Sequence, residues 1–260
     1  MHMRPSRVLS KLRSGKVATC TKLNLAEPRI AEIAAQSGFD CIWLCNEHVP
    51  TDWAVLENMI RAAKIYDVDT LVRVSKGGYS DWVRPLEADA TGIMVPHLMS
   101  AEEARSVART TRFHPIGRRP VDGGNADGAY ARVEFGEYIA TANRERFVIV
   151  QIEDPEPLDE LDEIASVEGI DMLFFGPGDF SQGIGHPGEF DHPLVVETQR
   201  RIVDVCLAHG KVAGTVCSAA NAGLLVEMGY RFLSIGADVV GLGSYFSQAF
   251  RDIRAACAAG

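Results

Sequence analysis

The chain has 260 residues and a mass of 28.3 kDa, close to the roughly 250 residues of an eight-fold α/β barrel, so we expect one domain over residues 1–260. Hydrophobic residues make up 47% and charged residues 23%, as in soluble globular proteins, which excludes disorder of the whole chain. The net charge of -9 provides no basic field for a phosphate backbone, so nucleic acid is not an expected partner.

The cysteines and the hydropathy bear on the compartment. Six cysteines are scattered without a C-x-x-C pair and without the density of a disulfide-stapled secreted domain, which favours a reducing cytoplasm. Residues 1–15 are basic, but no apolar run follows them, and no stretch reaches the roughly 18 apolar residues of a membrane helix. We therefore expect a cytoplasmic protein without a membrane partner.

Short apolar or β-branched runs alternate with longer amphipathic stretches about eight times along the chain. The expected strands are residues 17–25, 40–47, 69–75, 92–98, 147–153, 171–178, 211–217 and 232–238, and helices are expected at 27–38, 53–67, 100–112, 157–167, 193–210 and 219–229. Apolar strands that are each followed by a helix indicate a parallel sheet buried on both faces. Eight units favour a closed (β/α)8 TIM barrel, and an open doubly wound sheet is the alternative.

Two segments interrupt this alternation. Residues 113–135 are rich in Gly, Pro, Asp and Asn, and loops of this length inside a domain are usually functional or mobile. Residues 241–260 are expected to form an extra C-terminal helix with an aromatic face, which covers the barrel or reaches a neighbouring chain.

Two acids stand where a barrel places its active site, at the carboxyl ends of the strands. Glu153 ends the fifth expected strand and Asp179 follows the sixth. Since these strands are neighbours, the two carboxylates could give hard oxygen ligands to one divalent cation (Mg, Mn or Co) and leave positions open for substrate. Each acid could equally cap the helix that follows it, and the residues alone leave both interpretations open.

Other polar residues follow the same strand ends. Arg73 lies in the apolar run LVRVS, where its guanidinium could bind a carboxylate or enolate oxygen, or form an internal ion pair with a site acid. His48 could act as a general base or be a surface histidine at a helix entrance, and His97 is a second candidate. The turn at 176–179, Gly-Pro-Gly-Asp, could hold a carboxylate on its backbone N–H groups, although such turns are also common connectors.

Taken together, these segments resemble the HpcH/HpaI aldolase family, metal-dependent class II pyruvate aldolases that cleave 4-hydroxy-2-oxo acids. The resemblance spans nearly the whole chain and rests on GFDCIWLCNEH, LVRVS, VPHLMSAEEARSVARTTRFHPIGRRP, VQIED, GIDMLFFGPGDFSQGIGHPG and IGADVVGL. Its most specific part is VQIE with GPGD, which separates Glu153 from Asp179 by 26 positions. The resemblance implies a phosphoenolpyruvate/pyruvate-type TIM barrel.

The resemblance also implies roles for single residues. Glu153 and Asp179 would be the metal ligands, His48 the base that takes the hydroxyl proton of the aldol, and Arg73 the group that stabilises the enolate oxygen. Substrate would further contact Gln151 and the backbone of Gly178 and Asp179, and Glu87 takes the place of the aspartate that raises the basicity of the histidine. No organic cofactor and no Schiff-base lysine would be needed; no lysine stands out at a strand end, and Lys76 is the nearest.

The partners implied are a small 2-oxo acid such as pyruvate, an aldehyde, and further copies of the chain in a homo-oligomer. Members of the family form hexamers by exchanging carboxyl-terminal helices, with which residues 241–260 are compatible.

Three departures from the family pattern make the substrate of known members an unsafe guide. The acid of a D-x-E-H motif, which helps to order water beside the metal, is Cys45 here, and Glu87 carries its carboxylate on a longer arm. The G-x-R-G-x-G turn reads Gly-Arg-Arg-Pro at 117–120. The alternatives are an oxaloacetate-type decarboxylase, a malyl- or citramalyl-CoA-type lyase or a condensing enzyme on the same site, and a catalytically silent ligand-binding barrel.

Overall fold

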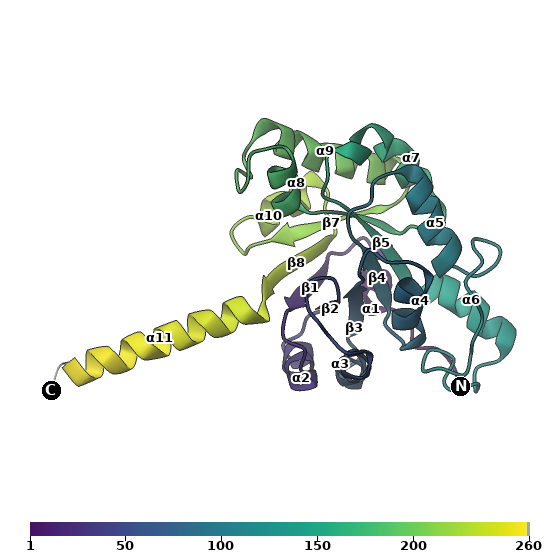
Figure 1. Ribbon diagram of the computed structural model, residues 1–260, viewed down its shortest axis with the longest axis horizontal. Helices are drawn as coiled ribbons and strands as arrows, with labels where there is room; N and C mark the ends of the chain where they lie inside the picture. Colours follow the sequence, from purple (N-terminus) through teal and green to yellow (C-terminus); the bar gives the residue numbers. More distant parts are fainter. Residues whose placement is uncertain (259–260) are drawn as a thin grey trace.

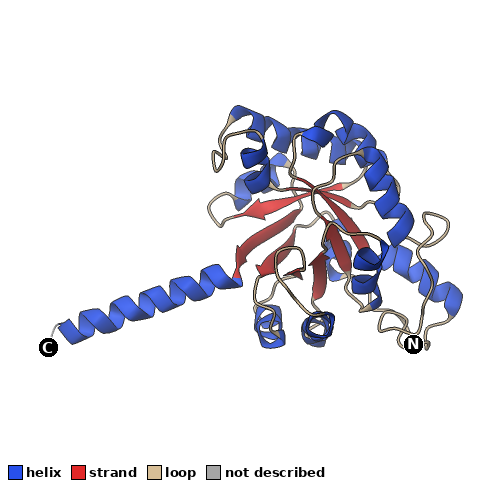
Figure 2. Ribbon diagram, in the orientation of Figure 1, coloured by secondary structure: helices blue, strands red, loops and turns tan. Residues whose placement is uncertain are grey.

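The computed structural model describes residues 1–258, and within them eight parallel strands close into a barrel in chain order (Figures 1 and 2). The strands are β1 Ala18–Leu23, β2 Cys41–Cys45, β3 Asp69–Arg73, β4 Gly92–Val95, β5 Phe147–Ile152, β6 Met172–Phe175, β7 Val212–Cys217 and β8 Phe232–Ala237. Each strand lies within a range expected from the sequence. The TIM-barrel prediction is confirmed, and the doubly wound alternative is wrong because β8 pairs with β1.

All of the helices except the last lie around the barrel (Figure 1). The helices are α1 Arg7–Arg13, α2 Pro28–Gln36, α3 Trp53–Ile65, α4 Tyr79–Glu87, α5 Ala101–Thr111, α6 Phe135–Glu145, α7 Leu161–Ser166, α8 Pro177–Gly183, α9 Pro193–Ala208, α10 Ala222–Met228 and α11 Asp238–Ala258, with a 3-10 turn, η1, at Glu156–Glu160. Four of them, α1, α4, α6 and α8, were not expected. The Pro85 inside α4 and the Gly-Pro-Gly start of α8 weaken the usual sequence signals of a helix.

The barrel interior follows the two-residue period of β-strands. Its packed side chains include Cys20 of β1, Trp43 of β2, Leu71 of β3, Ile149 of β5 and Phe174 of β6. Two residues further along each of these strands, the same face carries Lys22, Cys45, Arg73, Gln151 and Gly176. The interior therefore changes from apolar to polar at the carboxyl ends of the strands.

The segment 113–135 is packed against the molecule rather than detached from it. Arg119 and Asp127 form a buried ion pair at 2.8 Å, and the hydroxyl of Tyr138 in α6 donates to the same carboxylate at 2.8 Å. Phe113 and Tyr138 pack edge-on beside this network in a small apolar cluster of their own. The segment thus carries its own core.

The C-terminal helix α11 extends away from the barrel (Figure 1). Within the described residues it buries no side chain, and its large apolar residues Val239, Val240, Tyr245, Phe246, Phe250 and Ile253 are exposed. The extra helix is as expected, whereas the idea that it covers the barrel of its own chain is wrong; residues 259–260 of the expected helix lie outside the described residues. Among residues 1–258, no helix combines the length and apolar character needed to cross a membrane.

Candidate active site

A cavity of about 300 Å³ opens at the carboxyl ends of the strands. It is lined by Lys22, Trp43, His48, Arg73, Gln151, Phe174, Gly176, Pro177, Gly178, Asp179, Val216, Cys217, Ser234 and Gly236. Five residues expected at the site, His48, Arg73, Gln151, Gly178 and Asp179, are therefore brought to one cavity.

The two candidate metal ligands come from adjacent elements at this end of the barrel. Glu153 directly follows β5 and is 1% exposed, and Asp179 lies in the first turn of α8. Burial raises the pKa of Glu153 to about 7; the backbone N–H of His97, 2.9 Å from Oε1, opposes this rise, and the charge of Asp179 adds to it. Asp179 is thus close enough to disfavour the ionisation of Glu153.

Gly176 provides the space that this carboxylate occupies. A Cβ at this position would come within 2.6 Å of Glu153 Oε2 and 2.9 Å of Gln151 Nε2. Such contacts are shorter than van der Waals packing permits, so a larger residue would push the Glu153 side chain away. The first glycine of the GPGD turn, Gly176, therefore leaves the room that the Glu153 side chain needs.

These residues fit one divalent cation of the Mg, Mn or Co type. Glu153 and Asp179 offer hard oxygen donors, and the buried Oε1 of Gln151 has no hydrogen-bond donor, while its Nε2 donates to Glu153. A cation would also relieve the repulsion between the two acids. Over residues 1–258, no group of three or more His, Cys, Asp and Glu side chains is arranged to hold a metal.

Arg73 lies at the wall of the cavity, where it forms an ion pair and can also contact a ligand. Its Nε is 2.8 Å from Oε2 of Glu47, and one terminal nitrogen donates to the Sγ of Cys45 at 3.4 Å. The internal ion pair that the sequence allowed is therefore present, although its partner is Glu47 rather than Glu153 or Asp179. The guanidinium nevertheless lines the cavity, where it can meet an oxyanion.

Glu47 lies close to both candidate bases, His48 and His97, which the sequence did not suggest. Its carboxylate lies 3.6 Å from Nε2 of His48 and 3.7 Å from Nε2 of His97. Burial lowers the pKa of His97, but the hydrogen bond to Asp154 and the nearby carboxylates outweigh it and raise the pKa overall. His48 is the more accessible of the two, with 57% of its side chain exposed, and it lines the cavity.

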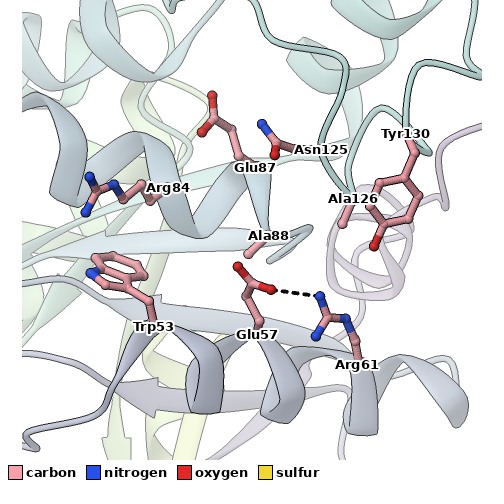
Figure 3. A pocket seen from close by; sticks show the side chains of 9 residues that line it. All are labelled: Trp53, Glu57, Arg61, Arg84, Glu87, Ala88, Asn125, Ala126 and Tyr130. Atoms are coloured by element: carbon pink, nitrogen blue, oxygen red, sulfur yellow. Dashed lines mark hydrogen bonds and ion pairs between the residues drawn. The ribbon is translucent and has the colours of Figure 1, made fainter.

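Glu87 is not brought to His48 within one chain. It lies at the end of α4 and lines a different pocket, with Trp53, Arg84 and Asn125 among its neighbours (Figure 3). Within residues 1–258 its carboxylate forms no hydrogen bond or ion pair with His48, and burial raises its pKa. The expected effect of Glu87 on the histidine therefore stays a prediction.

Lys22 of β1 lines the cavity, whereas no strand-end lysine was expected to stand out. Its position two residues after the inward-facing Cys20 is the sequence signal that could have identified it. Lys76 instead donates to the backbone carbonyl of His97 and does not line the cavity.

Comparison with known proteins places this site in a family. The HpcH/HpaI aldolase/citrate lyase family matches residues 22–243. The chain is 35% identical over 215 residues to a hydroxypyruvate/pyruvate aldolase of Delftia acidovorans, covering 82% of this chain and 80% of that protein. It is 34% identical over 236 residues to a 2-keto-3-deoxy-L-rhamnonate aldolase of Shigella sonnei, covering 88% and 86%.

A solved structure of an HpcH/HpaI aldolase from Desulfitobacterium hafniense superposes with a TM-score of 0.89 at 31% identity, covering 95% of this chain and 96% of that one. The resemblance noted from the sequence and the expectation of an aldolase, a carbon-carbon lyase, are thereby confirmed. The match over most of the chain, in sequence and in fold, shows that the chain belongs to the HpcH/HpaI aldolase/citrate lyase family.

Proposed function

We propose that this chain reversibly cleaves a 4-hydroxy-2-oxo acid into pyruvate, or a similar 2-oxo acid, and an aldehyde, with one divalent cation (Mg, Mn or Co) held by Glu153 and Asp179. The observation that carries the proposal is that the interacting carboxylates of Glu153 and Asp179 lie in the same strand-end site as Arg73 and His48. The aldolase names of the relatives support the choice of reaction.

The cleavage follows from the positions of the side chains. His48 takes the proton of the 4-hydroxyl group, the bond between C3 and C4 breaks, and the aldehyde forms as the bonding electrons pass into the 2-oxo group. Arg73 holds the resulting enolate oxygen, and C3 then receives a proton to give the 2-oxo acid. When bound, the cation supplies a positive charge that lowers the free energy of the enolate.

Binding of the 2-oxo acid falls to residues on the β5 and β6 side of the cavity. Gln151 offers its unpartnered Oε1 beside Glu153, and Gly178 and Asp179 present backbone at the start of α8, where N–H groups lack partners within the helix. These groups orient the substrate so that its C3 faces Arg73 and His48. No organic cofactor enters this scheme.

We make four further proposals about the domain, its location, Glu87 and the assembly. We take residues 1–260 as one barrel domain, and we place it in the cytoplasm because all six of its cysteines are free. We propose that Glu87 supports His48, as the family pattern implies. We also propose a homo-oligomer, hexameric as in its family, in which the exposed apolar residues of α11 are covered by another copy.

The proposed reaction is tested by exchange of deuterium from solvent into the methyl group of pyruvate, which reports enolate formation without an aldehyde. The protein is treated with a chelator and then supplied with Mn or Mg. Exchange is expected to need added metal and to fall by about 100-fold or more in Glu153→Ala, because one of two protein ligands is lost. Glu156→Ala, which removes an exposed acid three residues away, is the matched control.

No exchange by the fully metallated wild type contradicts the pyruvate-aldolase proposal. A second assay offers oxaloacetate: release of carbon dioxide without any aldol product from an aldehyde panel indicates a decarboxylase instead, and dependence on coenzyme A indicates a CoA-ester lyase.

A further inference from the structure

Lys22 is a cation in the cavity that the proposed aldol chemistry does not use. Its Cα is in register with Trp43 on the neighbouring strand β2, and its Nζ lies 5.4 Å from the centroid of the Trp43 ring. The guanidinium carbon of Arg73 lies 4.9 Å from the same ring. Two cations therefore share one aromatic wall of the cavity.

The two cations differ in their partners. Arg73 is paired with Glu47 at 2.8 Å, whereas the Lys22 ammonium forms no ion pair or side-chain hydrogen bond anywhere in residues 1–258. The nearby carboxylate of Asp238 instead accepts the backbone N–H groups of residues 24 and 25, at 2.8 and 2.9 Å. A half-buried ammonium without a paired anion loses hydration and does not gain the full Coulomb attraction of an ion pair in return.

The electrostatics agree with this geometry. Burial lowers the pKa of Lys22, repulsion from Arg73 lowers it further, and the acidic groups of Cys45, Glu47 and Asp238 oppose only part of the effect. An anion placed beside Lys22 would favour the charged ammonium again.

The position of Lys22 indicates which part of a substrate would supply the anion. In an eight-stranded barrel β1 lies across from β5, so Lys22 lies across the cavity from Gln151 and from the end of β5, which Glu153 follows. With the 2-oxo acid bound beside Gln151, as proposed above, the far end of the aldehyde partner would reach this side of the cavity. Ser234 of β8 also lines the cavity here and adds a hydroxyl donor.

We propose that Lys22, with Ser234, forms a subsite for the terminal carboxylate of the aldehyde partner, so that aldehydes carrying a carboxylate are the preferred acceptors. One ammonium and one hydroxyl suit a carboxylate, whereas a phosphate dianion usually gathers several N–H donors or a helix N-terminus. This inference rests on the proposed aldolase function and adds a substrate class to it.

The test compares anionic aldehydes with neutral aldehydes of the same shape. Pyruvate is added to succinic semialdehyde or to 4-methylpentanal, and to glyoxylate or to 2-methylpropanal, and the aldol products are quantified by mass spectrometry. The measured quantity is the ratio of kcat/KM for the anionic aldehyde to kcat/KM for its neutral counterpart. For at least one pair, this ratio is expected to exceed one in the wild type and to fall about 10- to 100-fold in Lys22→Met, since a charge-assisted hydrogen bond is lost.

Two variants guard against a merely structural effect. Lys22→Arg keeps the charge and should retain the ratio within about threefold, whereas Lys22→Gln keeps polarity without charge and should lose it. Using the ratio within each variant cancels any general loss of active protein.

A wild type that adds neutral aldehydes as well as anionic ones, or a Lys22→Met ratio equal to that of the wild type, overturns the subsite. A preference for glyceraldehyde 3-phosphate over both carboxylates overturns the choice of carboxylate. Methyl exchange separates these results from failure of the aldolase proposal, because a wild type that exchanges deuterium and adds neutral aldehydes is an aldolase whatever the role of Lys22.

Discussion

Gly176 lies beside the side chain of Glu153, one of the two proposed metal ligands, and a side chain at position 176 would occupy the place of that carboxylate. In Gly176→Ala the new methyl group would meet Glu153 Oε2 at 2.6 Å and the Glu153 Cβ at 2.8 Å. The carboxylate must then move, and we expect affinity for Mn to fall by about 10-fold or more, as when a metal ligand is misoriented. Calorimetric titration of the metal-free protein with Mn measures this change.

The neighbouring glycine gives a matched control for that experiment. A Cβ at Gly178 meets no atom within 4 Å, so Gly178→Ala should keep its affinity for Mn within about threefold. This change is clearly smaller than the loss of about 10-fold expected when a ligand is displaced. Equal affinity in Gly176→Ala and wild type argues that Glu153 does not bind the metal in the observed rotamer. Equal losses in both variants point instead to a general effect on the turn.

For single residues of the site, the sequence was most informative at the ends of the strands. The position of Arg73 in an apolar run and of His48 after β2 predicted that both reach the cavity, and they do. The sequence could not identify Glu47 as the partner of Arg73, because that contact depends on how β2 and β3 are staggered. Lys22 was not predicted because it lies before the end of β1, where only the alternation from the inward-facing Cys20 indicates that it reaches the cavity.

Among the elements, the segment between α5 and α6 is held by charges rather than by regular structure. The side chains of Arg119 and Asp127 are 1% and 0% exposed, and Tyr138 shares the Asp127 carboxylate. Burial raises the pKa of Asp127 even though Arg119 opposes the rise, which indicates how costly the desolvation is. The network is therefore sensitive to loss of one member.

Asp127→Ala is expected to lower the free energy of unfolding by about 3–5 kcal/mol, because the guanidinium of Arg119 is left buried without an anion. Urea denaturation measures the change, and Asp122→Ala, which removes an exposed acid of the same segment, is the control. Replacing both partners, in Arg119→Met with Asp127→Ala, should recover part of the loss. A loss below about 1 kcal/mol in the single variant indicates that the segment is loosely packed in solution.

Two of the four helices that the sequence failed to predict share a physical reason. Helices α4 and α8 contain proline or glycine in their first or last turns, so their local propensity is low and tertiary packing decides their conformation. The strands were easier to predict because most of them, β2 to β6, are buried on both faces and read as short apolar runs.

For the whole molecule, closure of the barrel was predictable from the count of strand-helix units, whereas the position of the C-terminal helix was not. An amphipathic helix indicates that an apolar face is covered, but it does not indicate by which chain. In the structure α11 leaves the barrel, and Phe246 and Phe250 are 63% and 61% exposed. Burying several such side chains would contribute on the order of 10 kcal/mol, which is enough for a stable contact between copies.

We therefore expect the protein to be a homo-oligomer whose assembly depends on α11. Phe246→Glu with Phe250→Glu puts two charges on the apolar face of this helix and should shift the mass measured by light scattering towards that of the 28.3 kDa chain. Ser244→Glu with Gln248→Glu adds the same charges at the same spacing on the opposite face and should leave the mass unchanged. A monomeric wild type contradicts the assembly, and an oligomer that survives the phenylalanine changes shows that copies associate through another surface, so that α11 would remain exposed in the assembled protein.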